Sequence, residues 1–180
     1  MNHELSAWTV GHSTRSADEF GNLLRSHQIK ILVDVRSYPS SSRHPHFEKH
    51  ALSEYLSGLD IQYVHAPLLG GRRSPKKDSR NTAWQNASFR AYADYMETAS
   101  FQQGVRELLE VAARERTAIM CAESLWWRCH RSLISDYLKA KGVSVLHILS
   151  ETKTELHPYT AAAKIVDGEL SYRGLLDVEG

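Results

Sequence analysis

The segment from Cys121 to Arg131 holds the densest group of side chains that could do chemistry. It reads Cys-Ala-Glu-Ser-Leu-Trp-Trp-Arg-Cys-His-Arg. A cysteine that ends an apolar strand just before a helix can be favoured as thiolate by backbone N–H groups and by the helix dipole. Glu123 suits general acid–base work, and Arg128 and Arg131 suit bidentate binding of an anion. We therefore expect Cys121 and Glu123 in catalytic roles beside an anion site.

Each of these groups also has a structural interpretation. Cys121 could be an inert thiol, because free cysteine is among the most buried residue types, and Glu123 could be a helix-terminal carboxylate. The phosphatase spacing of cysteine, five residues and arginine is absent, since position 127 is tryptophan. His130 could serve as base for a thiol or bind a metal with Cys129, but structural zinc sites supply four ligands. We expect no metal site and no cofactor, with zinc left as the alternative.

Two more polar groups follow predicted strands. Asp34 and Arg36 alternate at a strand end, so their side chains point to the same face. We expect Asp34 in a catalytic role and Arg36 in substrate binding, unless the two only pair with each other. His12 and Ser13 form a polar turn after the first strand. We expect His12 in catalysis and Ser13 in substrate binding, and capping of the next helix is the alternative.

A long basic loop spans residues 68–86 and opens with two glycines. Loops of this length are usually functional or disordered. Basic side chains beside an aromatic suit phosphate contact and base stacking, and a solvated mobile loop is the alternative. The residues expected to bind substrate in this loop and in the turn after Cys121 are Gly70, Gly71, Arg72, Arg73, Trp84, Trp126, Trp127, Arg128, His130 and Arg131.

Alternating strands and helices must position these groups. Strands are predicted at 8–11, 29–35, 61–66, 117–121 and 143–149, and helices at 17–27, 50–59, 89–96, 101–113 and 132–141, with a hairpin at 163–172. This alternation predicts an α/β fold: a single three-layer domain over residues 1–180, with a mainly parallel sheet of about five strands. The small hairpin belongs to a C-terminal extension, residues 150–180. Ligands bind beyond the C-terminal ends of such strands, so one crevice should collect the polar groups.

The length, composition and net charge of the chain exclude some classes of protein. The chain has 180 residues, 42% of them apolar, and a net charge of +1. This excludes a globally basic nucleic-acid binder but allows a local basic patch. No apolar run reaches about 18 residues, and the N-terminus does not resemble a signal peptide. We therefore expect no membrane span and a cytoplasmic protein with thiols at Cys121 and Cys129; oligomeric state is not indicated.

The order of these motifs resembles a bacterial and archaeal family called domain of unknown function 488. The resemblance runs from about Thr9 to His147 and departs at Trp126, where a proline is usual. It implies a fold and a site, but no reaction, because the activity of the family is not established. The motifs that carry it are Gly11-His12-Ser13, Asp34-Val35-Arg36, Pro39, Leu69-Gly70-Gly71, Cys121-Ala122-Glu123 and Cys129-His130-Arg131.

The expected function is an enzyme that acts on an anionic substrate, either a nucleotide or a base in nucleic acid. A hydrolase- or glycosylase-like activity would fit, and a base within a duplex would first have to be flipped out. A nucleotide or nucleic-acid binding module without catalysis is one alternative, and it would not need Cys121 or Glu123. A thiol redox or zinc-binding protein that uses Cys121, Cys129 and His130 is the other.

Overall fold

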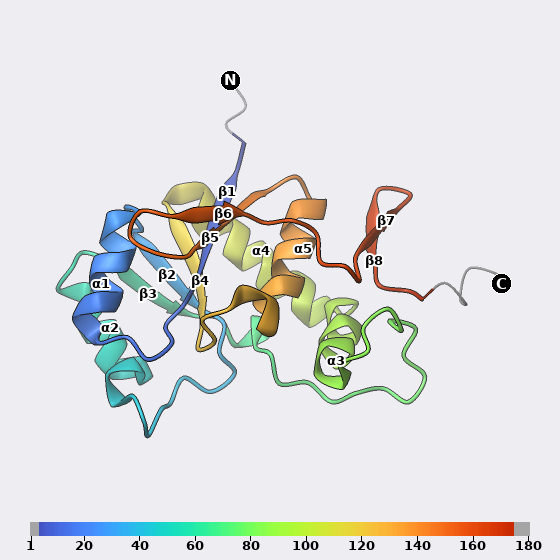
Figure 1. Ribbon diagram of the computed structural model, residues 1–180, viewed down its shortest axis with the longest axis horizontal. Helices are drawn as coiled ribbons and strands as arrows, with labels where there is room; N and C mark the ends of the chain where they lie inside the picture. The colour runs from blue at the N-terminus through green and yellow to red at the C-terminus, as the bar shows by residue number, and fades with distance from the viewer. Residues whose placement is uncertain (1–3, 175–180) are drawn as a thin grey trace.

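The chain folds around one six-stranded sheet, in a computed structural model that describes residues 4–174 (Figure 1). The strands are β1 (Ser6–Gly11), β2 (Ile31–Asp34), β3 (Gln62–His65), β4 (Thr117–Cys121), β5 (Ser144–Ile148) and β6 (Thr154–Leu156). Their order is β3-β2-β4-β1-β5-β6, and every neighbouring pair is parallel except β5 and β6. The mainly parallel sheet is thus confirmed, and β2, β4 and β1 end side by side at its centre.

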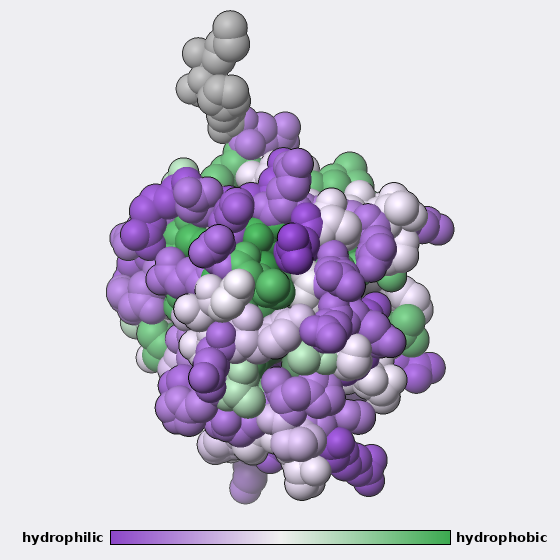
Figure 2. Space-filling view, turned by 90° about the vertical axis from the view of Figure 1, so that its left-hand side faces the viewer, coloured by the Kyte–Doolittle hydropathy of each residue, from purple (hydrophilic) through white to green (hydrophobic). Residues whose placement is uncertain are grey.

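Helices cover both faces of this sheet. They are α1 (Ala17–Ser26), α2 (Lys49–Ser57), α3 (Ala87–Met96), α4 (Ala99–Arg114) and α5 (Arg131–Ala140). Three 3-10 turns join them: η1 (Pro45–Phe47), η2 (Pro67–Leu69) and η3 (Trp126–Arg128). Figure 1 shows α1 and α2 on one side of the strands and α4 and α5 on the other, which confirms the three layers. Figure 2 views the side of α1 and α2, whose surface is mainly hydrophilic with small apolar patches.

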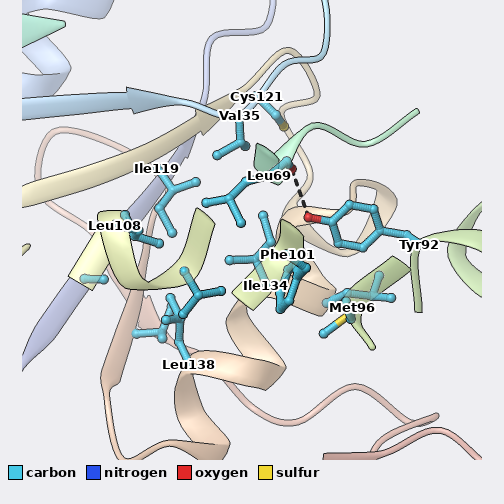
Figure 3. Close-up of a cluster of buried hydrophobic side chains, with 14 of the residues drawn as sticks. Val35, Leu69, Tyr92, Met96, Phe101, Leu108, Ile119, Cys121, Ile134 and Leu138 are labelled. Atoms are coloured by element: carbon cyan, nitrogen blue, oxygen red, sulfur yellow. Dashed lines mark hydrogen bonds between the residues drawn. The ribbon is translucent and has the colours of Figure 1, made fainter. Parts of the chain in front are cut away.

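Two apolar cores hold the layers together. Phe20 of α1 and Leu52 of α2 belong to one core, which packs on β2 and β4. Phe101 of α4 belongs to the other, with side chains from α3, α5 and the opposite face of the sheet (Figure 3). In this second core the hydroxyl of Tyr92 donates to the carbonyl of Leu69 at 2.9 Å. This bond anchors the start of the long basic loop against α3.

Local residue patterns explain where the first helix begins and where the C-terminal hairpin turns. Ser16 accepts from the backbone of Glu19, whose side chain accepts from Ser16, so the capping box before α1 is complete. The C-terminal hairpin pairs β7 (Lys164–Val166) with β8 (Glu169–Ser171). Its two turn residues, Asp167 and Gly168, have φ of 51° and 81°, as a tight hairpin turn with positive φ at both positions requires.

The sheet contains one strand that the sequence did not predict. β6 has only three residues, and it forms because the edge of β5 offers unpaired backbone groups to the chain returning after Leu149. The last six residues of the predicted C-terminal extension, 175–180, lie outside the described residues. Within residues 4–174, none of the helices has both the length and the apolar character needed to cross a membrane.

Candidate active site

An open cleft of about 1290 Å³ lies beyond the C-terminal ends of β1, β2 and β4. This is where the strand-end rule predicts a ligand site. Its lining comes from segments that are far apart in the sequence, from the turn after β1 to the start of α5. The predicted site residues that line it are His12, Ser13, Arg36, Gly71, Arg72, Cys121, Glu123, Arg128 and His130.

The floor of the cleft is set by close pairing of two strand ends. Gly11 of β1 lies opposite Cys121 of β4, and beyond them the His12 N–H donates to the Cys121 carbonyl at 2.9 Å. A Cβ atom on Gly11 would lie 1.9 Å from the carbonyl oxygen of Glu123. Only glycine therefore allows the turn after Cys121 to approach β1 this closely.

The two cysteines meet at this floor. Their Sγ atoms are 2.8 Å apart, although neither is in a disulfide. The Nε of Arg131 donates to the Cys121 Sγ at 3.0 Å, and the Arg131 backbone N–H lies 3.5 Å from the Cys129 Sγ. The Nδ1 of His130 lies 3.3 Å from the Cys129 Sγ. The sequence placed these four groups in one segment, and the turn between β4 and α5 folds them into contact.

The contacts in this cluster shift the pKa values of the two thiols in opposite directions. Burial tends to raise the pKa of both, and it holds the pKa of Cys121 well above its ordinary value. For Cys129, burial is outweighed by the hydrogen bond from Cys121 and by the charge and backbone N–H of Arg131, which lower its pKa to about 7. We therefore assign the thiolate to Cys129, whereas the sequence alone favoured Cys121.

His130 is oriented to accept a proton from Cys129. Its Nε2 lies 3.0 Å from the carbonyl of Val35, which can only accept, so Nε2 carries the proton. The Nδ1 that faces Cys129 is then the free acceptor. Burial lowers the pKa of His130, so the ring is neutral at pH 7.

Gly71 is expected to tolerate no larger side chain, because a Cβ there would lie 2.6 Å from the Nδ1 of His130. The Gly71→Ala variant should push the ring away from Cys129 and slow thiol alkylation at pH 7 by about tenfold. Gly58→Ala is a matched control, since the nearest atom to its Cβ is a carbonyl oxygen at 3.4 Å. Equal alkylation rates in the two variants would contradict a role for His130.

Asp34 and Arg36 form a buried ion pair beside the thiols. The Arg36 Nη2 donates to Asp34 at 2.7 Å and to the Phe47 carbonyl at 2.8 Å, and Nε donates to Asp34 at 2.9 Å. Tyr63 also donates to Asp34. Asp34 is fully buried, and Arg36 borders the cleft with its side chain 8% exposed. Asp34 therefore lies below the cleft and pairs with Arg36. This pairing is the structural alternative to the catalytic role that the sequence analysis expected for Asp34.

His12 is buried between this pair and η1. Its ring stacks on Phe47 with centroids 4.1 Å apart, and its Nδ1 donates to the Ser13 carbonyl at 2.8 Å. The Nη1 of Arg36 lies 3.5 Å from its Nε2. Burial, reinforced by the charge of Arg36, lowers the pKa of His12 to about 4 despite the bond to Ser13. At neutral pH the ring is uncharged, with Nε2 as acceptor.

Stability is expected to fall as the pH drops from about 6.5 to 4. In this window the unfolded chain binds a proton at His12 that the folded protein binds only below about pH 4. Unfolding then takes up a proton, which weakens the fold by about 3 kcal/mol at the acid end. Urea denaturation of the wild type and of His12→Asn across this range measures the effect. A variant curve with the same pH slope as the wild type would contradict it.

The remaining predicted residues lie outside the cleft lining. Arg131 is 2% exposed and directs its side-chain donors at Cys121, Thr9 and the Glu123 carbonyl, so it supports the floor from below. Trp126 stacks on His147 with centroids 4.4 Å apart. Gly70, Arg73, Trp84 and Trp127 are likewise absent from the lining: Arg73 stacks on Tyr95, Trp84 packs on Phe89 and Tyr172, and Trp127 is half exposed.

Other residues at or below the cleft were not among the expected catalytic and binding groups. Cys129, which lines the cleft, was named in the sequence only for the zinc and thiol redox alternatives. Arg43 and Tyr38 come from the loop after β2, which read only as a polar segment. Tyr63, which holds Asp34, had no local signal because it lies 29 positions away. Within the described residues, no group of three or more His, Cys, Asp or Glu side chains could hold a metal ion.

Comparison with known proteins identifies one relationship. Residues 16–138 match the family model described as "Domain of unknown function DUF488". The matched region includes Arg36, Gly71, both cysteines and Arg131, and so covers most of the cleft. No curated protein and no solved structure matches the chain.

Proposed function

Because this chain belongs to the family described as domain of unknown function DUF488, no activity comes with the relationship, and we propose one from the cleft itself. The protein is an enzyme that acts on an anionic substrate, a nucleotide or a base in nucleic acid. The Cys129 thiolate is its nucleophile. The observation that carries this proposal is the contact of Cys129 with Cys121, His130 and Arg131 at the floor of the cleft.

The rim of the cleft supports an anionic substrate. Arg43, Arg72 and Arg128 line it, and none of them pairs with a carboxylate in the described part of the chain. Guanidinium groups bind phosphate oxygens bidentately. Tyr38 also lines the cleft and is 68% exposed, with the Arg72 guanidinium 5.5 Å from its ring centroid. An exposed aromatic ring among arginines suits a base joined to a phosphate.

A covalent mechanism follows from the chemistry of the floor. His130 takes the proton of Cys129 through Nδ1, and the thiolate attacks the electrophilic carbon or phosphorus of the substrate. The protonated His130 gives this proton to the leaving group, and the Glu123 carboxylate, which is exposed at the cleft, then takes a proton from the water that attacks the covalent intermediate and releases the product. The proton taken by Glu123 is returned to the Cys129 thiolate that the departing product regenerates. Neutral His12 accepts a hydrogen bond from the substrate at Nε2.

Ligand binding at two salt concentrations tests this function. A screen of nucleotides and single-stranded oligonucleotides should find a ligand whose affinity falls with added salt. Arg72→Gln and Arg128→Gln should each weaken that ligand and reduce the salt slope by about one unit if they contact phosphates. Arg114→Gln, on the exposed C-terminal end of α4, is the control. Affinity that does not depend on salt would reject the anionic substrate.

Turnover of that ligand separates catalysis from binding alone. Cys129→Ser and Glu123→Gln should keep ligand affinity within a few fold and lower turnover by about 10³-fold or more. If the wild type and both variants bind equally and none converts the ligand, the binding module without catalysis is the better description.

The 2.8 Å contact between the sulfur atoms favours a second candidate, a thiol redox protein. In a reducing cytoplasm, the location that the sequence predicts, the resting pair would be two thiols. The Cys129 thiolate would attack a low-molecular-weight disulfide, release one thiolate and form a mixed disulfide. Cys121 would then attack that mixed disulfide, lose its proton and release the second thiol. Incubation with oxidised glutathione should lower the protein mass by two hydrogen atoms, and a stable glutathione adduct would reject this candidate.

A further inference from the structure

A continuous chain of buried hydrogen bonds connects the floor of the cleft, through His147 of β5, with Asp136 of α5. The Nη1 of Arg131 donates to Thr9 Oγ1 at 3.1 Å, and that oxygen lies 2.6 Å from the Nδ1 of His147. The Nε2 of His147 lies 2.8 Å from the Nδ1 of His157. The Nε2 of His157 lies 2.8 Å from Asp136 Oδ1. The chain thus joins a buried guanidinium to a buried carboxylate through one hydroxyl and two imidazole rings.

This chain lies inside the protein. Thr9 and Asp136 are fully buried, and Arg131, His147 and His157 are at most 2% exposed. Buried polar groups cost stability unless they are hydrogen-bonded, so each of these five side chains needs its partners in the chain. None of its members is needed to complete the apolar clusters on either face of the sheet.

With both histidine rings neutral, the two ends of the chain determine the direction of every bond in it. Asp136, as a carboxylate, can only accept, so the Nε2 of His157 carries a proton and its Nδ1 accepts. The Nε2 of His147 must then donate to it, which leaves the Nδ1 of His147 as the acceptor of the Thr9 hydroxyl proton. Thr9 Oγ1 in turn accepts from Arg131, which can only donate. All donors point from Arg131 toward Asp136.

Two further observations agree with this direction. It requires a neutral His147, and burial, with the neighbouring His157 and Arg131, lowers the pKa of His147 to about 2. The Asp136 carboxylate also accepts hydrogen bonds from outside the chain. The Thr160 N–H and hydroxyl donate to it at 2.9 and 2.5 Å, and the Tyr172 hydroxyl donates at 2.7 Å. The carboxylate therefore accepts four hydrogen bonds and is fixed in place.

We propose that Asp136 is a positioning residue that acts through His157, His147 and Thr9 to hold the Arg131 guanidinium against Cys121 and beneath the Glu123 carbonyl. The inference rests on the proposed function, because the thiol pair is what Arg131 serves. With Nδ1 of His147 unprotonated, the Thr9 hydroxyl is turned away from Arg131 and offers its oxygen. Arg131 then keeps Nε on Cys121 at 3.0 Å and Nη2 on the Glu123 carbonyl at 2.7 Å.

Positioning and simple electrostatics predict opposite results when Asp136 is removed. Loss of a nearby negative charge would by itself stabilise a thiolate and lower the pKa of Cys129. Loss of positioning frees Arg131 from the thiols and raises that pKa. The rate of Cys129 alkylation as a function of pH therefore distinguishes the two effects by sign.

The experiment compares wild type, Asp136→Ala, Thr9→Val and Tyr172→Phe. Asp136→Ala and Thr9→Val should raise the pKa of Cys129 by about one unit and slow alkylation at pH 7 by about tenfold. Tyr172→Phe is the matched control, because it removes a buried donor to the same carboxylate but leaves the chain to Arg131 intact. The alkylation rate of Tyr172→Phe at pH 7 should stay within twofold of the wild-type rate. If Asp136→Ala does not fold, Thr9→Val tests the same prediction. Valine has nearly the shape of threonine, so this variant should still fold.

A folded Asp136→Ala or Thr9→Val protein with wild-type thiol reactivity, or with a lowered pKa of Cys129, would overturn the inference. Nitrogen-15 NMR of the histidine rings in the wild type gives a readout that does not involve the thiols. Protons on Nε2 of both His147 and His157 are expected, and a proton on Nδ1 of His147 would also overturn it. If the rings have the expected tautomers but wild-type Cys129 is unreactive at pH 7, the proposed thiol function fails while the bond direction stands.

Discussion

The Cys129→Ala variant is expected to lose alkylation by iodoacetamide at pH 7, with a rate about a hundredfold below that of wild type. At this pH a thiol whose pKa is about 7 is half ionised, and the thiolate is the form that reacts. The remaining Cys121 has its pKa raised well above the ordinary range by burial, so very little of it is thiolate. Mass spectrometry of the modified protein between pH 5 and pH 10 gives the rate and the site of reaction.

Cys121→Ala provides the matched control, because it removes the partner sulfur and leaves Cys129 at the cleft. The pKa of Cys129 should rise in this variant, since the hydrogen bond from Cys121 is part of what lowers it. Alkylation at pH 7 should slow by roughly tenfold and recover fully near pH 9. If Cys121→Ala abolishes the reaction and Cys129→Ala does not, the nucleophile is Cys121, as the strand-end position first suggested.

Asp34→Ala is expected to lower the free energy of unfolding by about 3–5 kcal/mol, because it leaves a buried guanidinium without its counter-charge. Arg36 makes three side-chain bonds of 3.2 Å or less to Asp34 with Nε and Nη2, and Tyr63 loses its acceptor as well. Urea denaturation followed by circular dichroism measures the loss. Binding of any cleft ligand should weaken too, since Arg36 would no longer be held at the cleft wall.

An exposed ion pair provides the comparison. Lys141 and Glu169 are 2.9 Å apart, but their side chains are 39% and 71% exposed, so Glu169→Ala should change stability by less than about 1 kcal/mol. The double variant Asp34→Ala/Arg36→Met should recover part of the loss, because it removes the unpaired charge. An Asp34→Ala protein as stable as Glu169→Ala would show that Arg36 finds another partner or reaches water.

Features that depend on neighbours in the chain could be predicted from the sequence. The capping box of Ser16 and Glu19 and the hairpin turn at Asp167 and Gly168 involve residues no more than three positions apart, so their physics is local. The apolar runs predicted all five parallel strands within a few residues. The rule that ligands bind at strand ends then predicts that His12, Arg36 and Cys121 meet at one cleft, and all three line it.

Roles that depend on burial and on long-range contact could not be predicted in this way. Arg128 and Arg131 look equivalent in the sequence, yet Arg128 borders the cleft and Arg131 is buried beneath it, because Arg128 ends η3 and Arg131 is the first residue of α5. Cys129 rather than Cys121 has the lowered pKa, because burial raises the pKa of Cys121, whereas at Cys129 burial is outweighed by the contact with Cys121 and by the charge of Arg131.

The buried chain from Arg131 to Asp136 is the clearest case of a feature that only the packed protein contains. Thr9 and His147 are 138 positions apart, and no motif links them. β1 and β5 become neighbours in the sheet and bring the two side chains to 2.6 Å, while Trp126 seals them by stacking on His147. Residue types and order thus determine the layers and the location of the cleft. Which groups are charged, aligned and exposed within it depends on desolvation and on contacts between distant segments, and these exist only once the chain has folded.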